Sequence, residues 1–185
     1  MLEAQTLTQA LRVQKIEIVR TSSPKQTDTT QRWKLTLRHI DSGTEVPTRI
    51  EFSRRGLSGE TVVESADAAI IRGYRLYPVI VQHYSAPAAF AQKVSALALR
   101  EQVQARDLFD LTLLLDAGGA ERPLPVEAAR HLAAATENAM AIDRDAFVGH
   151  VLAYLEPEYQ SHYGSREAWE RLQEDVVVAL TGLQP

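Results

Sequence analysis

Cysteine is absent from the 185 residues, which excludes disulfide bonds, thiolate metal sites and cysteine nucleophiles. No apolar run approaches the roughly 20 residues that a membrane-spanning helix needs, so we expect no membrane segment. The first residues lack the basic stretch and apolar core of a signal peptide, and we expect a cytoplasmic protein. The five histidines show no pair at metal-ligand spacing, and no P-loop, Rossmann fingerprint or G-x-S-x-G motif is present.

Charge is distributed unevenly, although the whole chain carries a formal net charge of only −4. Residues 1–85 hold 12 Lys and Arg against 9 Asp and Glu, whereas residues 86–185 hold 8 against 15. A basic first half suits phosphate groups or RNA, but a mixed solvated surface explains the same numbers. Because no dense Lys/Arg block is present, charge alone favours the solvated surface.

The chain reads as strands followed by helices, and we predict an α+β fold. Alternating apolar residues predict strands at 15–20, 32–40 and 46–52, the last two forming a hairpin, and β-like pieces at 61–64 and 75–81. The polar segment 21–30 is predicted to be a loop. Apolar periodicity then predicts helices near 87–100, 103–117, 125–138, 144–155 and 165–181. We therefore expect a sheet region at 1–85 and a helical domain at 86–185.

Five charged residues stand among the apolar positions of the first two predicted helices: Lys93, Arg100, Arg106, Asp107 and Asp110. Lys93 and Arg100 are seven residues apart, which places them two turns along one helix face. This pattern indicates either a structural ion-pair network, with the arginines bound to the aspartates, or a site for an anionic substrate.

The spacing K-x-x-A-L-x-x-R followed by R-D-x-x-D-L resembles the helical region of AbiEii-type nucleotidyltransferase toxins, the toxin halves of bacterial type IV toxin–antitoxin systems. The resemblance extends to the segments around Pro24–Thr27, Arg32–Lys34 and Thr48–Arg55, and it covers roughly residues 15–117. It implies a partial nucleotidyltransferase sheet followed by a helical domain. It also implies transfer of a nucleotide from an NTP, with Mg²⁺, to an acceptor for which RNA, including tRNA, is one candidate.

The resemblance assigns expected roles to individual residues. Glu51 matches the third metal-binding acid, and Lys93 is expected to contact the triphosphate, with Arg100 and Arg106 beside it. Asp107 is the expected functional aspartate of the second motif, and Asp110 is the next choice. The alternatives are an exposed Glu51 paired with Arg49 or Lys34 across the hairpin, a lysine at the edge of an apolar helix face, and structural Arg–Asp pairs. Arg54 and Arg55 suit either phosphate binding or a plain surface loop.

The chain departs from the family pattern in one respect. The Gly-Ser turn and the D-x-D motif that hold the nucleotide phosphates and two metals are not found upstream, and the only D-x-D is Asp143–Asp145. That motif opens a predicted helix and is expected to be an N-cap with an acidic first turn. We therefore expect the C-terminal portion of such a toxin, either a split or truncated gene product or a family member that has lost its catalytic head. It is expected to be inactive alone, and activity is expected to return if a separate polypeptide supplies the missing N-terminal fragment.

Two other hypotheses compete with this one. In the first, the chain is a non-catalytic interaction module that binds an antitoxin or a complementary fragment through an unpaired sheet edge. In the second, the chain is an unrelated helical domain in which the charged pattern is coincidental. The sequence does not identify the nucleotide, the acceptor, the oligomeric state or the antitoxin.

Overall fold

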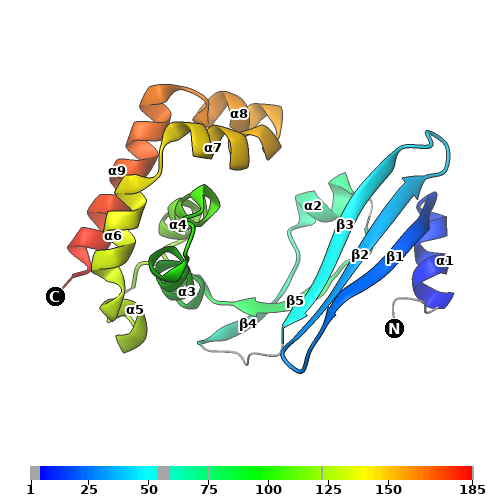
Figure 1. Ribbon diagram of the computed structural model, residues 1–185, viewed down its shortest axis with the longest axis horizontal. Coiled ribbons are helices and arrows are strands. Elements are labelled where there is room, and N and C mark those ends of the chain that lie inside the picture. Colours follow the sequence, from blue (N-terminus) through cyan, green and yellow to red (C-terminus); the bar gives the residue numbers. More distant parts are fainter. Residues whose placement is uncertain (1–4, 54–58, 75, 122, 185) are drawn as a thin grey trace. The chain divides into compact units, whose positions relative to one another are not determined.

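The computed structural model describes residues 5–53, 59–74, 76–121 and 123–184, and it confirms the α+β class (Figure 1). Two compact units divide the chain, Met1–Leu57 and Ser58–Pro185. Each unit is described by itself below.

The first unit consists of one helix and an antiparallel sheet. The helix α1 (Gln5–Val13) packs against β1 (Ile16–Gln26), and the sheet order is β1-β2-β3, with β2 (Thr30–His39) between β1 and β3 (Glu45–Ser53) (Figure 1). The predicted hairpin is therefore confirmed as β2–β3. Gly43 has a φ of +68° in its turn, a left-handed conformation that glycine adopts without a steric penalty.

The predicted loop over 21–30 is wrong for most of its length. β1 continues to Gln26 and pairs with β2, which leaves residues 27–29 as the connection. This end of β1 is mostly exposed, and polar side chains fit an exposed edge strand, so polarity alone did not indicate a loop here. Pro24 lies within a register shift between Ser22 and Lys25, on a strand at the edge of the sheet, where a proline removes no ladder hydrogen bond.

The second unit begins with a two-stranded antiparallel sheet of β4 (Thr61–Ser65) and β5 (Ile80–Tyr84), joined through the short helix α2 (Ala68–Gly73). The β-like piece predicted at 75–81 becomes regular strand only from Ile80, after Pro78. The strand then leads directly into α3 (Ala86–Leu99), whose first turn is capped by the Ser85 hydroxyl accepting from the amide of Ala88.

The boundary between the two compact units lies between residues 57 and 58, whereas the predicted change from strands to helices lies between residues 85 and 86. The small sheet is attached to the helices for a local reason. The amide of Ser85 donates to the carbonyl of Glu60 at 3.0 Å, and Gly59 lies so close to Ala88 that a Cβ on Gly59 would be 2.9 Å from the Ala88 Cβ. These contacts fix the start of the hairpin against the start of α3.

The remaining helices form the rest of the second unit: α4 (Ala105–Asp116), α5 (Val126–Arg130), α6 (Leu132–Ala141), α7 (Arg144–His150), the 3₁₀ turn η1 (Leu152–Tyr154), α8 (Pro157–Tyr163) and α9 (Arg166–Gly182). The helix predicted at 125–138 is interrupted at His131, and the one predicted at 144–155 ends in the 3₁₀ turn. The predictions near 87–100, 103–117 and 165–181 agree with α3, α4 and α9 to within a few residues.

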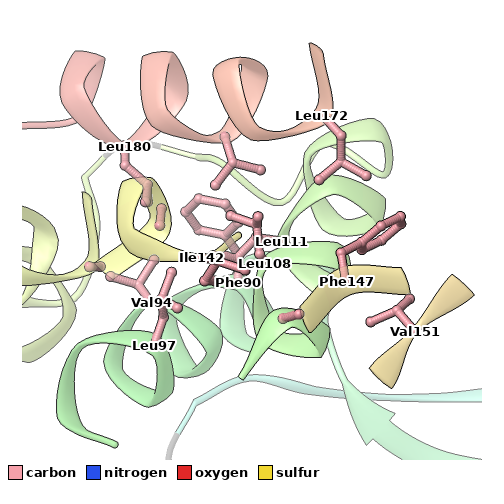
Figure 2. Packing of buried hydrophobic residues seen from close by; sticks show 14 of the residues in the cluster. Phe90, Val94, Leu97, Leu108, Leu111, Ile142, Phe147, Val151, Leu172 and Leu180 are labelled. Carbon is pink, nitrogen blue, oxygen red and sulfur yellow. The ribbon is translucent and has the colours of Figure 1, made fainter. Parts of the chain in front are cut away.

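The core of the second unit lies between α3, α4, α6, α7 and α9. Its members share near-complete burial, and Figure 2 shows how they converge from these helices: Phe90, Val94, Leu97, Leu108, Leu111, Ile142, Phe147, Val151, Leu172 and Leu180. Burying one such side chain stabilises the fold by about 1.5–3 kcal/mol. This core therefore fixes α3 and α4 against each other, and these two helices carry most of the predicted site.

None of the helices in the described ranges is both long enough and apolar enough to cross a membrane.

Candidate functional site

A cluster of ionised side chains joins α3 to α4. Lys93 lies on α3, Arg100 is the residue that ends α3, and Asp107 is in the first turn of α4. The Lys93 Nζ lies 3.0 Å from the Asp107 Oδ1, and the Arg100 Nε donates to the Asp107 Oδ2 at 2.5 Å. Lys93 also pairs with Asp110, one turn further along α4. The structure therefore brings together four of the five charged residues that the sequence singled out.

Asp107 is the centre of this cluster because its side chain is 0% exposed. A buried carboxylate is tolerated when it is paired and hydrogen-bonded, and here both of its oxygens accept hydrogen bonds from cations. Its place in the first turn of α4 adds a favourable interaction with the helix dipole. The cations are only partly covered, with Lys93 31% and Arg100 38% exposed.

The protonation of Lys93 follows from these contacts. Burial lowers the pKa of Lys93, but hydrogen bonds to Asp110 and Asp107, together with the charges of both carboxylates, outweigh burial and raise the pKa above its ordinary value. Lys93 is therefore a firmly charged ammonium group, held in position by one buried and one half-exposed carboxylate.

Arg106 does not join the cluster, so the alternative in which both arginines pair with the aspartates holds for Arg100 alone. Its side chain is exposed, and it makes no ion pair within the part of the chain that the structure describes. The physical reason is the helical repeat, because Asp107 faces the core and the preceding residue is rotated by about 100° toward solvent. Lys93 is the cation that pairs with Asp110.

Glu51 lies on β3 and forms an ion pair, but not with the expected partners. The strand register places Arg32 directly opposite Glu51, and the Arg32 Nε donates to the Glu51 Oε2 at 2.6 Å. Arg49 is opposite Lys34, so neither of these cations bonds Glu51. The hydrogen bond from Arg32 lowers the pKa of Glu51 below its ordinary value, with a smaller contribution from the charge of Arg49. Glu51 is therefore an ionised surface carboxylate.

Glu51 and Lys93 belong to different units, so their expected convergence on one phosphate chain stays a prediction. Arg54 and Arg55 lie outside the described residues.

The described residues alone do not fit a magnesium site. No group of three or more His, Asp or Glu side chains converges within the described ranges, and Mg²⁺ requires several oxygen ligands. Both oxygens of Asp107 are already bonded to cations, and Asp110 is bonded to Lys93. The D-x-D at Asp143–Asp145 serves the helix, because the Asp143 Oδ1 accepts from the amide of Ala146 at 2.7 Å as an N-cap. That expected role is confirmed.

Sequence reasoning did not identify the pairing of Arg32 with Glu51. The signal was present in the alternation of β2, where Arg32, Lys34, Thr36 and Arg38 occupy one face. The apolar alternation of the other face was the pattern used to predict the strand. The pairing of Arg32 with Glu51 depends on the register between β2 and β3, which that alternation does not fix.

Comparison with known proteins gives one family. A model described as the nucleotidyl transferase AbiEii toxin of type IV toxin–antitoxin systems matches residues 3–181. No curated protein sequence matches the chain.

Two of the solved structures with a similar fold come from Helicobacter pylori. JHP933 has a TM-score of 0.52 and 18% sequence identity, over 91% of this chain and 66% of its own. A candidate nucleotidyltransferase has a TM-score of 0.51 and 16% identity, over 92% of this chain and 71% of its own. At this level of identity the comparison concerns the fold, and the chain spans about two thirds of the length of these neighbours.

Proposed function

The chain belongs to the AbiEii family of nucleotidyltransferase toxins from type IV toxin–antitoxin systems, and from this premise we propose that it takes part in transferring a nucleotide from an NTP to an acceptor. RNA, including tRNA, is the proposed acceptor class, and an antitoxin is the proposed partner. Mg²⁺ is the proposed metal, which would neutralise charge on the phosphates when bound.

The observation that carries this proposal is the setting of Lys93. Its ammonium group is charged, partly exposed and held by Asp107 and Asp110, so its position is fixed before any ligand arrives. A point charge in a fixed position suits the phosphate chain of an NTP. We assign phosphate binding to Lys93, and we assign to Asp107, Asp110 and Arg100 the positioning of that lysine and of the helices around it.

Glu51 is proposed as one carboxylate of a metal site that other residues must complete. Its Oε1 accepts no hydrogen bond within the described ranges, whereas its Oε2 accepts from Arg32. A single strand carboxylate does not make a two-metal site, and no step of the reaction is assigned to the metal here.

We further propose that these 185 residues do not transfer nucleotides by themselves. The sequence contains no Gly-Ser turn followed by D-x-D upstream of the sheet, so two of the expected metal-binding acids must come from another segment. Purified chain incubated with labelled NTPs, Mg²⁺ and total tRNA is expected to transfer no label. Adding a polypeptide that carries the Gly-Ser and D-x-D motifs is expected to restore transfer to the native chain and not to Lys93→Met. Strong transfer by the chain alone would refute the proposed dependence on a second segment.

A second candidate function, a non-catalytic interaction module, is favoured by a different observation. The segment from β4 to β5 exposes large apolar side chains that a solvated surface does not need, including Val63, Tyr74, Tyr77 and Ile80 at 66%, 67%, 86% and 71%. The DNA next to the coding region separates the two candidates. A neighbouring segment that encodes Gly-Ser and D-x-D favours the enzyme, and its absence beside a winged-helix antitoxin gene favours the binding module.

A further inference from the structure

One face of the three-stranded sheet is built from charged and hydroxyl side chains. Directly opposite residues of antiparallel strands lie on the same face, so the register fixes which side chains share it. At one end of this face Arg32 pairs with Glu51, and at the other end Arg38 pairs with both Glu17 and Glu45. All three carboxylates that β1, β2 and β3 contribute to this face are therefore occupied by arginines.

The two rows between these ends contain cations without carboxylates. One row is Ser22–Lys34–Arg49, and the next is Arg20–Thr36–Pro47. Arg20, Lys34 and Arg49 are exposed, and none forms an ion pair with another described residue. Three positive charges thus lie within two adjacent rows, where neighbouring strands are about 4.8 Å apart and alternate residues of one strand about 6.8 Å apart.

The same residues line an open hollow of about 520 Å³ in this unit. Its lining combines the three cations with the hydroxyl groups of Ser22 and Thr36. Lysine, arginine, serine and threonine are the side chains that contact phosphate oxygens in nucleic-acid complexes. Arginine adds a planar fork that matches a phosphate group.

We propose that this middle part of the polar sheet face, formed by Arg20, Lys34 and Arg49, binds the phosphate backbone of a nucleic acid without reading its bases. The aromatic residues of the sheet, Trp33 and Phe52, lie on its opposite face, so this face offers no aromatic side chain on which a base could stack. This proposal depends on the proposed function in one respect only, which is that the bound nucleic acid is taken to be the acceptor.

A nucleic acid fits this face better than a protein does. Protein interfaces are organised around buried aromatic and aliphatic anchors, and between its two paired ends this face offers three cations, two hydroxyl groups and one proline. These three unpaired cations contribute to the basic balance of residues 1–85.

Fluorescence anisotropy with a labelled oligouridine tests the proposal, in the absence of NTP and Mg²⁺ so that failure of nucleotide transfer does not affect the result. Three phosphate contacts predict a salt slope of about −2, so that binding weakens about twenty-fold between about 50 and about 200 mM salt. The variant Arg20→Gln/Lys34→Gln/Arg49→Gln is expected to lose about tenfold or more in affinity at low salt and most of the salt slope.

The matched control is Arg72→Gln/Arg130→Gln/Arg171→Gln, which removes three exposed cations from the second unit and changes the net charge equally. It is expected to bind like the native chain. The proposal is overturned if the two triple variants lose affinity equally, or if the sheet variant binds normally. It is also overturned if polyglutamate binds as tightly as oligouridine, because the face then takes an acidic protein. The salt dependence of binding is also measured on the native chain alone. A slope near zero overturns the proposal, even if the sheet variant fails to fold.

Discussion

At the scale of single residues, Asp107 determines what the cluster on α3 and α4 can do. It is the only fully buried charged side chain among the described residues, and two cations reach it from the end and the middle of α3. The sequence left open whether the arginines and aspartates pair with each other or bind an anionic substrate, and the structure shows this pairing for Arg100 and Asp107. It could not predict the partner of Asp110. Arg106 lies four residues before Asp110 on the same helix, whereas Lys93 reaches Asp110 from α3, and only the packing of α4 against α3 decides between them.

Removing the buried charge should destabilise the second unit. Asp107→Asn is expected to lower the free energy of unfolding by about 2–3 kcal/mol, because the ion pairs with Lys93 and Arg100 are lost from a buried position, although both cations keep some access to water. Asp110→Asn, at a half-exposed position, is expected to cost less than about 1 kcal/mol. Denaturant titration in a Trp33→Phe background measures this, since Trp169, stacked on Phe147, then reports on the helices alone. Equal losses for both variants would contradict a central role for Asp107.

The raised pKa of Lys93 makes the stability of the second unit sensitive to alkaline pH. A lysine whose pKa is higher in the folded than in the unfolded state contributes stability that is complete below the unfolded value of 10.5 and is lost as the pH rises through the folded value. Stability is therefore expected to fall above about pH 10.5. Burial also raises the pKa of Tyr163, which acts in the same direction, so the comparison is made in Tyr163→Phe with and without Lys93→Met. The same alkaline loss in both proteins would show that Lys93 does not cause it.

At the scale of elements, the strands and long helices followed from periodicity, and the exceptions have local causes. β1 extends through a serine- and threonine-rich segment because β2 supplies its hydrogen-bond partners and a bulge accommodates Pro24. The division at 57/58 was not readable, because it depends on a contact between Gly59 and Ala88 that no sequence pattern encodes. The polar face of the sheet could be predicted in part. The alternation of β2 shows which of its residues share that face, but the bulges in β1 decide which residue of β1 lies in each row, and the sequence does not show them.

The contact at Gly59 predicts that the junction between the small sheet and α3 is sensitive to substitution. Gly59 has a φ of +116°, and an added Cβ would lie 2.9 Å from the Ala88 Cβ. Gly59→Ala is therefore expected to cost about 1–3 kcal/mol in the stability of the second unit. Gly73→Ala is the control, because a Cβ there meets nothing within 4 Å and φ is not positive. Thermal unfolding followed by circular dichroism compares them, and equal midpoints would contradict this account of the junction.

At the scale of the whole molecule, the two units carry different parts of one proposed activity. The sheet unit contributes Glu51 and the basic hollow, and the helical unit contributes the cluster around Lys93. The fold class and the family resemblance were accessible from sequence, because both rest on local patterns that span most of the chain. The expected convergence of Glu51 and Lys93 stays a prediction, because the two residues belong to different units.

Equilibrium titration of ATP against the native chain and Lys93→Met tests the central claim most directly, since Lys93 is the only lysine in residues 58–185. The measurement is made well below the unfolding temperature of the variant, with Lys15→Met as the control because Lys15 also pairs with an aspartate, Asp41. The account predicts that Lys93→Met weakens ATP binding about tenfold or more, the loss of one charge-assisted contact to phosphate, while Lys15→Met binds like the native chain. Unchanged ATP affinity in folded Lys93→Met would contradict the account and leave the cluster as a structural ion-pair network.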